Sequence, residues 1–320
     1  MKNVLVIGST GQIGSELTMK LRKMYHQGTI VAGYIPGAEP KGELLESGPA
    51  EIVNVTSAHT ISEVVDKYDI DTIYNLAALL SATAERKPLM AWDIQMNGLI
   101  NILEIAREKH CAVFTPSSIG SFGPDTPRDN TPQDTIQRPT SMYGVTKVAT
   151  ELLSDYYFHK YGVDTRSVRF PGLISYTTLP GGGTTDYAVE VFYEIIKPGH
   201  HYTCEVPHDS YMDMMYMPDA LKAVTDLMEA DPAKLKHRNS FNIASMSFTP
   251  EILFEAIKKR IPEATFDYNV DPVKAAIADS WPNMMDDSCA REEWGWKPVW
   301  DMDAVIDDML AACRRKAGLK

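Results

Sequence analysis

The sequence predicts an α/β fold: a doubly wound parallel sheet with a smaller C-terminal lobe whose segments are interleaved with the first in sequence. Three observations predict it. Short apolar runs recur along the first half of the chain, amphipathic helical segments separate them, and a glycine-rich turn follows the first run. Strands that alternate with helices form parallel sheets, and ligands bind beyond the carboxyl ends of such strands.

The first apolar run, at 2–7, leads directly into the turn GSTGQIG and then into an amphipathic helix that reaches Met24. Glycines at such a turn let the backbone approach a pyrophosphate, which then lies against the amides of the helix N-terminus. Because the turn lies between a strand and a helix, it predicts a dinucleotide site of the Rossmann type. Its expected contacts are Gly8, Gly11, Gln12, Ile13 and Gly14.

The second strand, expected at 29–33, departs from the usual dinucleotide pattern. An acidic residue about 20 residues beyond the glycines normally binds the adenosine ribose. Here Gly33 and Tyr34 occupy that place, Glu39 is the next acid, and the first Lys or Arg after this strand is Lys41. Since a 2′-phosphate requires a positive partner, NAD is favoured over NADP.

Further strands are expected at 51–55 and 71–76, with a helix at 61–68 between them. The stretch 75–78 (NLAA) then lies at the rim of the site, followed by 79–83. Ser81 is a candidate substrate contact, and a serine that caps the loop is the alternative.

A long helix is expected at 89–109 and carries Asn97, for which a solvated or packing role is the alternative. A strand at 111–117 ends in Ser117 and Ser118, whose hydroxyls can reach a bound substrate. The next strands are expected at 163–170 and at 240–244, the second of which returns to the main sheet. Helical patterns follow at 188–196, 218–230 and 250–261.

The stretch SMYGVTK, at 141–147, places Tyr143 and Lys147 four residues apart. In a helix these two side chains lie on one face, and an ammonium favours the phenolate form of a neighbouring tyrosine. The pair therefore predicts a base, although the same spacing also occurs by chance in many helices. Gly162 is expected to end this helix.

The segment 171–187 is rich in glycine, proline and threonine, and it contains no lysine or arginine. Such a segment predicts a loop that closes over a substrate rather than a core element.

Composition excludes several classes of function. The net charge is −12 and the pI is about 5.1, which argues against nucleic acid or an anionic membrane surface as a partner. No apolar run approaches the ~20 residues of a membrane span, and the N-terminus leads directly into a strand. A cytoplasmic location is therefore expected.

The four cysteines are scattered, so we expect neither disulfides nor a metal site.

Taken together, GSTGQIG, NLAA, Ser118 and YGVTK resemble the extended short-chain dehydrogenase/reductase family over nearly the whole chain. The resemblance implies that Ser118, Tyr143 and Lys147 are the catalytic residues, and that the protein forms a homodimer through a four-helix bundle. It also implies a set of NAD contacts: Gly8, Gly11, Gln12, Ile13, Gly14, Tyr34, Asn54, Val55, Leu76, Ala77, Ala78, Asn97, Ser117, Tyr143, Lys147 and Pro171.

Four stretches beyond residue 180 look like the threonine dehydrogenase branch of that family: GGGTTDYAVE, SFTPE, IADSWP and AREEWGW. They imply oxidation of the L-threonine 3-hydroxyl by NAD to give 2-amino-3-oxobutyrate. The implied substrate contacts are Ser81, Ser118, Tyr143, Thr185, with Thr184 as the second choice, and Trp281, which could equally be a core residue. Arg169 and Arg291 are expected to be structural ion-pair partners.

We expect an NAD-binding domain from 1–170 and about 211–247, and a substrate lobe from about 171–210 and 248–320. Two alternatives stay open. A sugar-nucleotide epimerase or dehydratase of the same family would require cations for a diphosphate. A dinucleotide-sensing regulator without catalysis would not require the pair of Tyr143 and Lys147.

Overall fold

The structure is a computed structural model that describes residues 3–179, 181 and 183–319. Contacts divide the chain into two compact units. Unit 1 comprises 1–121, 140–169 and 221–241, and unit 2 comprises 122–139, 170–220 and 242–320. The chain passes between the units several times, so each unit is built from segments that are far apart in sequence.

Unit 1 contains the strands β1 (Asn3–Ile7), β2 (Thr29–Tyr34), β3 (Ala50–Ile52), β4 (Thr72–Asn75), β5 (Ala112–Phe114), β6 (Ser117–Ser118) and β7 (Thr165–Arg166). Its helices are α1 (Gln12–Met24), α2 (Glu43–Glu46), α3 (Ala58–Tyr68), α4 (Ser81–Arg86), α5 (Pro88–Trp92), the π-helical turn η1 (Asp93–Asn97), α6 (Gly98–Lys109), the 3₁₀ turns η2 (Ile119–Ser121) and η4 (Pro232–Lys234), and α7 (Met142–Tyr161). Three elements lie where the chain crosses between the units: β8 (Val168–Phe170), α9 (Met217–Glu229) and β12 (Phe241–Asn242).

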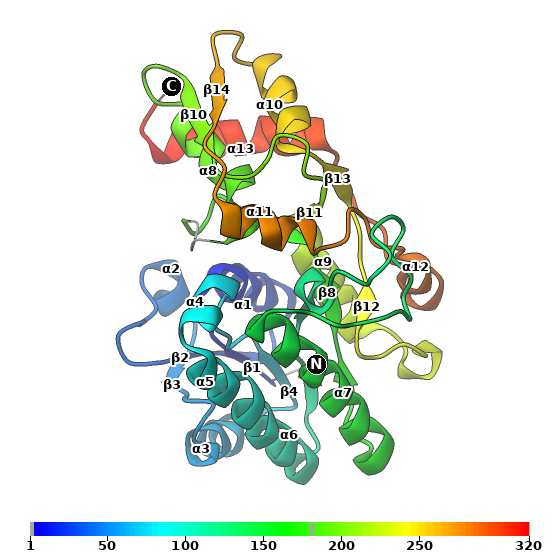
Figure 1. Cartoon of the computed structure of the whole chain (residues 1–320). Coiled ribbons are helices and arrows are strands. Elements are labelled where there is room, and N and C mark those ends of the chain that lie inside the picture. The colour runs from blue at the N-terminus through cyan, green and yellow to red at the C-terminus, as the bar shows by residue number, and fades with distance from the viewer. Residues whose placement is uncertain (1–2, 180, 182, 320) are drawn as a thin grey trace. The chain divides into compact units, whose positions relative to one another are not determined.

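The main sheet of unit 1 has six strands in the order β3-β2-β1-β4-β5-β7, and its neighbouring strands pair in parallel. The order reverses between β1 and β4, where dinucleotides bind in folds of this kind. Helices α3, α6 and α7 lie side by side (Figure 1) and enclose an apolar core with β1, β2, β4 and β5. The predicted fold class is therefore confirmed.

The helices of unit 1 form where apolar residues recur at helical spacing. Ile61, Val64 and Val65 bury one side of α3, as a period of 3.6 residues requires. Helix α7 ends at Gly162, as predicted, because this glycine adopts φ +71 and its N–H donates to the carbonyls of Tyr157 and Phe158.

Three expectations about individual elements were wrong. The helix expected at 89–109 contains the π-helical turn η1 between α5 and α6. The strand expected at 163–170 divides at Ser167, whose N–H donates to Arg238 and whose carbonyl accepts from Phe241. These bonds place β12 beside β8 in a small sheet, β12-β8-β6, so the strand expected at 240–244 does not join the main sheet.

Unit 2 contains the strands β9 (Gly172–Ile174), β10 (His201–Cys204), β11 (Met212–Tyr216), β13 (Met246–Phe248) and β14 (Thr265–Tyr268). Its helices are the 3₁₀ turn η3 (Thr184–Asp186), α8 (Tyr187–Ile195), α10 (Pro250–Lys258), α11 (Pro272–Asp279), α12 (Ser288–Trp294) and α13 (Met302–Lys316). Strands pair in the orders β13-β11-β9 and β10-β14. Residues of α8, α10 and α13 fill an apolar core against β10 and β11. Strand β9 lies in the segment 171–187, which therefore contributes to a sheet as well as to a loop.

The segment 122–139 groups with unit 2, although the sequence analysis placed it in the first domain. Hydrogen bonds within unit 2 give the reason. The Asn242 N–H donates to Gln133 Oε1, and the N–H groups of Asn283 and Met284 approach the Arg128 carbonyl. Which unit binds which ligand stays a prediction.

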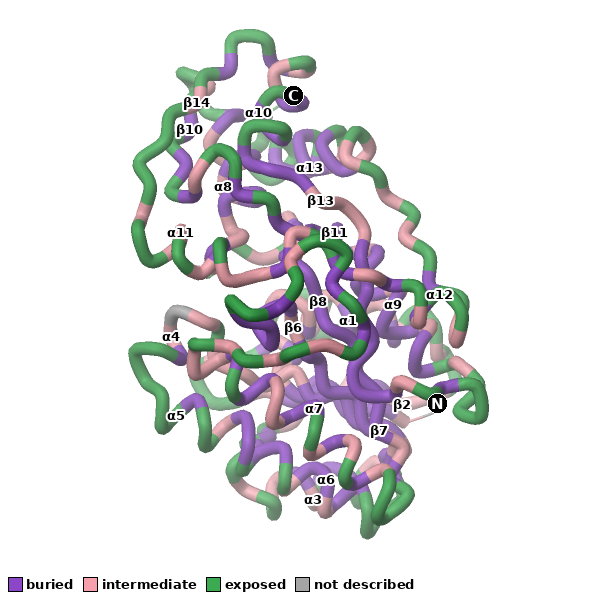
Figure 2. The backbone as a smooth tube through the Cα atoms, turned by 45° about the vertical axis from the view of Figure 1, so that its right-hand side comes forward, coloured by how far each residue is buried: buried purple, intermediate pink, exposed green. Residues whose placement is uncertain are grey.

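In each unit the central strands are buried, whereas many helices have an exposed face. Figure 2 shows the tube buried along β8 and exposed along much of α5. No helix within the described part of the chain is long and apolar enough to cross a membrane.

Asp213 in β11 gives unit 2 a specific pH dependence. This side chain is fully buried; Oδ2 accepts from the Met285 N–H at 3.0 Å, and Oδ1 has no hydrogen-bond partner among the described residues. Burial, with a smaller contribution from the Asp287 charge, raises the pKa of Asp213 to about 8. The carboxyl group is therefore protonated at neutral pH.

We predict that Asp213 lowers the free energy of unfolding progressively as the pH rises from about 4 to about 8. The folded state holds the Asp213 proton up to about pH 8, whereas the unfolded chain releases it near pH ~4. The group's stabilising contribution is therefore present at low pH and is lost through pH 8. Thermal unfolding of Asp213→Asn should show a flatter pH profile than wild type. Exposed Asp209→Asn is the control, and equal slopes for all three proteins would contradict the prediction.

Candidate active site

The glycine turn between β1 and α1 is shaped by close backbone contacts. Gly8 has φ +77, and a Cβ atom on Gly14 would lie 2.1 Å from the Gly8 carbonyl oxygen. The N–H groups of Gly8 and Ser9 both donate to the Gly33 carbonyl. Helix α1 follows with Gly11 as N-cap and no side-chain cap. The amides of its first turn, at Gln12 and Ile13, can therefore bind an anion, and this turn fits a pyrophosphate.

The end of β2 explains part of the departure from the dinucleotide pattern. A Cβ atom on Gly33 would lie 3.1 Å from the Val6 carbonyl oxygen, so close strand packing favours glycine there. Tyr34 is half-buried, and its contact with the adenosine stays a prediction. Glu39, the next acid, accepts from the Gly37 N–H at 2.8 Å and is fully exposed.

Two other predicted cofactor contacts lie after β3. Asn54 is exposed, and its Oδ1 accepts from the N–H and hydroxyl of Thr56. Val55 is buried, and a Cβ atom on Gly98 would lie 2.8 Å from its Cγ2 atom. Both residues shape the loop that follows β3, and their contact with a cofactor stays a prediction.

A small cavity of about 20 Å³ lies at the carboxyl ends of β4 and β5 in unit 1. Its lining combines the predicted rim with residues from η1, the β5–β6 connection and α7: Asn75, Leu76, Ala77, Ala78, Gln95, Thr115, Pro116, Lys147 and Thr150. A Cβ atom on Gly8 would lie 3.1 Å from the Leu76 carbonyl carbon, so the glycine turn and this rim are in contact. The structure thus brings the predicted pyrophosphate and catalytic residues of unit 1 to one edge of the sheet.

Helix α7 positions the tyrosine and the lysine. Ser141 caps its N-terminus by accepting from the Gly144 N–H at 3.1 Å. Lys147 is 6% exposed, and its Nζ donates to the Pro116 carbonyl at 2.7 Å. The same Nζ atom lies 5.4 Å from the centroid of the Tyr143 ring. The ammonium is therefore fixed beside the phenol, on the side of the cavity.

The side chains of Ser118 and Tyr143 both lie close to the α-carbon of Gly120. A Cβ atom on Gly120 would lie 3.0 Å from the Tyr143 Cε1 atom and 3.6 Å from Ser118 Oγ. The Gly120 N–H donates to Ser118 Oγ at 3.1 Å, which orients the hydroxyl. The three residues predicted to be catalytic are therefore neighbours in unit 1, and a side chain at position 120 would crowd them.

A buried ion pair lies one helical turn beyond Lys147. Arg169 Nη2 and Glu151 Oε2 are 2.7 Å apart, and both side chains are almost fully buried. The Ser117 hydroxyl donates to Glu151 Oε1. Ser117 therefore binds the ion pair through its side chain, and the predicted structural role of Arg169 is confirmed. Arg291 likewise pairs with Asp287 at 2.7 Å.

Asn97 is not among the residues that line this cavity, and its predicted contact with the cofactor stays a prediction. It is exposed in η1, and its Nδ2 donates to Asp93 Oδ1 at 2.7 Å. Gln95 of the same turn lines the cavity instead, and so does Thr115 after β5. Sequence reasoning missed both residues. The place of Thr115 just after a strand was a usable signal, whereas no periodic pattern points to Gln95.

The remaining predicted contacts divide between the units. Ser81 is the half-buried first residue of α4 in unit 1. Pro171, Thr184, Thr185 and Trp281 belong to unit 2. A Cβ atom on Gly172 would lie 2.6 Å from Thr185 Cγ2, and the half-buried Trp281 accepts through its carbonyl from Arg128 Nε at 3.3 Å. The segment expected to close, 171–187, includes residues 180 and 182, which lie outside the described part of the chain.

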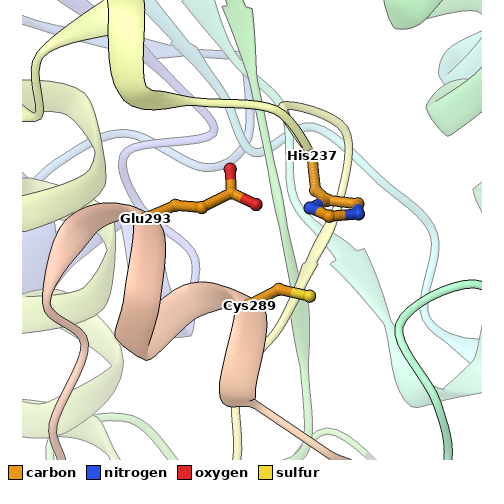
Figure 3. Close-up of side chains that lie close together, drawn as sticks. All are labelled: His237, Cys289 and Glu293. Carbon is orange, nitrogen blue, oxygen red and sulfur yellow. The ribbon is translucent and has the colours of Figure 1, made fainter.

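The cysteines are free thiols. Burial raises the pKa of Cys111, Cys204 and Cys313 to about 11 in each case, so these thiols stay protonated at neutral pH. Figure 3 shows Cys289 and Glu293, which are one turn apart on α12 in unit 2. Burial, and then the Glu293 charge, raise the pKa of Cys289. A protonated thiol is a poor metal ligand, and we assign no metal site to these residues.

Residues 4–244 match the model of the NAD dependent epimerase/dehydratase family. The chain belongs to this family, and NAD is its cofactor, which the glycine turn and the cavity beside Lys147 fit. The resemblance to extended short-chain dehydrogenases/reductases is thereby confirmed.

Solved structures and a curated relative are similar over almost the whole chain. An L-threonine dehydrogenase from Clostridium difficile is 54% identical over 99% of this chain and 98% of that chain, with a TM-score of 0.94. The holo form of a GalE-like L-threonine dehydrogenase from Cupriavidus necator is 44% identical over 97% and 99%, with a TM-score of 0.92. An uncharacterized epimerase/dehydratase from Staphylococcus saprophyticus is 53% identical over 99% of this chain and 98% of its own length.

We predict that Glu151→Gln destabilises the protein far more than Asp66→Asn. Both changes replace an acid by its amide in an ion pair of unit 1, but the pair of Asp66 and Lys109 is partly exposed. Removing one charge of a buried pair leaves the other uncompensated and costs about 3–5 kcal/mol, whereas exposed pairs contribute about 0–1 kcal/mol. Urea unfolding of the two variants measures the difference. Equal losses would mean that the buried pair does not hold α7 in place.

Proposed function

We propose that the protein oxidises the 3-hydroxyl of L-threonine with NAD, giving 2-amino-3-oxobutyrate and NADH. The observation that carries this proposal is the grouping of Tyr143, Lys147 and Ser118 around Gly120, in a chain 54% identical to a threonine dehydrogenase over nearly its full length. Bound NAD supplies the chemistry of hydride acceptance.

Tyr143 is the proposed general base. Loss of hydride from C3 leaves positive character on that carbon, so the hydroxyl proton must leave at nearly the same time. The proton passes from the substrate O3 atom to the Tyr143 phenolate, and the former O–H electron pair forms the carbonyl. The Lys147 ammonium, held by Pro116 at 2.7 Å, favours the phenolate.

Ser118 is the proposed hydrogen-bond partner of the reacting oxygen. Its Oγ accepts from the Gly120 N–H, so the hydroxyl proton remains available to donate to a substrate oxygen as it becomes a carbonyl. Lys147 also holds the nicotinamide ribose in this proposal.

The charged ends of threonine require further contacts. The proposed contacts are Ser81, Thr184, Thr185 and Trp281, and a tryptophan ring suits the substrate ammonium as a cation over a π face. The segment 171–187 has no lysine or arginine, which favours a small amino acid over the diphosphate of a sugar nucleotide. A non-catalytic regulator would have no use for the grouped Tyr143, Lys147 and Ser118. A cytoplasmic location is part of the proposal.

We predict that Tyr143→Phe lowers the threonine-dependent turnover by about 10²–10⁴-fold, as expected for loss of a general base. Removing one hydroxyl keeps the ring against Gly120, so NAD affinity should change little. NADH absorbance with NAD and L-threonine measures turnover, and NADP, L-serine and UDP-glucose serve as parallel samples.

Two results would contradict this assignment. Survival of most of the turnover in Tyr143→Phe would remove the phenol as base. If the wild-type protein binds NAD but produces no NADH with threonine, threonine is not the substrate.

Assembly as a homodimer is a further part of the proposal. Val145, Leu152 and Tyr156 lie 7 and 4 residues apart on α7 and are 41%, 64% and 45% exposed. Leu89 and Met90 of α5, a helix in contact with α7, are 84% and 50% exposed. Helical spacing places the three α7 residues on one face, and an apolar face of this kind suits a helix-to-helix contact with a second copy.

We predict that Leu152→Glu converts the dimer to a monomer, because a charge would be buried without a partner at the contact. Light scattering after gel filtration measures the mass. Ile252→Glu, at a 40% exposed position on α10, should leave the mass unchanged. A wild-type protein that is already monomeric would reject the dimer.

A further inference from the structure

Trp281 differs from two other tryptophans of unit 2. Trp296 is 2% exposed, and its Nε1 donates to the Ala244 carbonyl at 3.3 Å. The Trp300 ring lies edge-on to Tyr216, with ring centroids 4.9 Å apart. Trp281 is half-buried and is not a member of the apolar core of unit 2. Its ring has no aromatic, cationic or hydrogen-bonding partner within the part of the chain that the structure describes. The indole face is therefore available to a ligand.

The backbone of Trp281 is nevertheless held on both sides. Its N–H donates to the Ala278 carbonyl at 3.2 Å, which ties it to the end of α11. Its carbonyl accepts from Nε of Arg128, a half-buried residue of the segment 122–139, at 3.3 Å. A side chain whose backbone is already fixed loses less conformational freedom when it binds a ligand.

Asp129 provides a second link, just beyond Pro282. The Asn283 side-chain amide donates to Asp129 Oδ1 at 2.7 Å, and the Asn283 N–H donates to the Arg128 carbonyl at 2.9 Å. Pro282 has no N–H of its own to donate. The side chains of Arg128 and Asp129 therefore fix the chain on either side of this proline.

The links continue as a short parallel pairing. The Thr131 N–H donates to the Met284 carbonyl at 2.9 Å, and the Asp286 N–H donates to the Thr131 carbonyl at 2.9 Å. Thr131 and Met285 form a parallel β-bridge between these bonds. Thr131 is fully buried, so water has little access to the pairing.

Strands β11 and β13 hold the same segment through two further bonds. The Ser247 hydroxyl donates to the Asn283 carbonyl at 2.6 Å, and the Met285 N–H donates to Asp213 Oδ2 at 3.0 Å. Asp213 and Ser247 are themselves partners in the pairing of β11 with β13. The segment 283–286 therefore cannot shift without breaking bonds to the segment 128–131 and to this sheet.

We propose that Arg128 and Asp129 are positioning residues that hold the Trp281 ring as the binding face for the substrate ammonium. This inference rests on the proposed function. A cation is attracted to an indole face only within about 6 Å of the ring centroid, so the place of the ring decides the attraction. Since the ring has no partner of its own, the backbone links set that place. Neither positioning residue touches the substrate in this proposal.

The proposed role has a consequence for specificity. The threonine ammonium is remote from the reacting C3 and O3 atoms, so its contact with the ring is equally strong before and during hydride transfer. Contacts of this kind lower KM and leave kcat unchanged. A ligand such as 3-hydroxybutyrate, which lacks the ammonium, gains nothing from the ring.

Arg128→Met and Asp129→Ala test the positioning role. We expect the KM for threonine to rise by about 2–30-fold in each variant, the range that a cation–π contact implies, with kcat within about twofold of wild type. The inhibition constant of 3-hydroxybutyrate should stay unchanged. Arg128→Lys, which keeps a donor for the Trp281 carbonyl, should recover part of the loss. Arg138→Met, at an exposed arginine of the same segment, is the matched control.

Two kinetic results would overturn the role of these residues. One is an unchanged threonine KM in both Arg128→Met and Asp129→Ala. The other is an equal rise in the inhibition constant of 3-hydroxybutyrate, because it would show a general distortion of the site rather than loss of an ammonium contact.

Hydrogen exchange tests the links themselves, without turnover. The N–H groups of 283–286 are all hydrogen-bonded, so they should exchange slowly in the wild type and in Arg138→Met, and faster in Arg128→Met and Asp129→Ala. Equal exchange in all four proteins would overturn the positioning role. If the wild-type protein does not oxidise threonine, the proposed function and the ammonium site fail together, whereas exchange still decides whether Arg128 and Asp129 fix this segment.

Discussion

The buried pair of Glu151 and Arg169 is the interaction on which the geometry of unit 1 depends most. It joins α7 to β8, and the Ser117 hydroxyl adds β6 to the same group. Two charges removed from water must remain paired, so these three elements cannot move apart without a large loss of stability. Lys147 and Tyr143 lie one and two turns before Glu151 on α7, and Ser118 follows Ser117. The pair therefore acts on the candidate active site without touching its reacting groups.

The glycine turn depends on a different constraint, the close approach of backbone to backbone. At the point where the sheet order reverses, a Cβ atom on Gly14 would collide with the backbone of Gly8, and a Cβ atom on Gly8 would crowd the backbone of Leu76. This contact links the end of β1 to the rim that follows β4. As a result, the predicted pyrophosphate site and the cavity beside Lys147 lie at the same edge of one sheet, as the proposed reaction requires.

Periodic patterns predicted the features that depend on local sequence. The apolar spacing of α1 and α3, the stop at Gly162 and the spacing of Tyr143 and Lys147 are readable within a few residues of chain. The features that were not predicted depend on contacts between distant parts of the chain or on a break in the helical period. The bond from Ser117 to Glu151 joins residues that are 34 positions apart, and the pairing of β12 with β8 depends on contacts between Ser167 and a distant segment. Gln95 could not be predicted because the π turn interrupts the helical period on which the prediction relied.

The π turn also links an exposed apolar surface to the buried polar interior of unit 1. One additional residue within a helix rotates the turns before it by about 100° relative to the turns after it. Leu89 and Met90 therefore owe their outward direction to the same insertion that turns Gln95 inward. A one-residue deletion in η1 would restore an uninterrupted helix and rotate α5 as a whole. Gain or loss of this residue would therefore change the direction of the apolar residues on α5 and of Gln95 together.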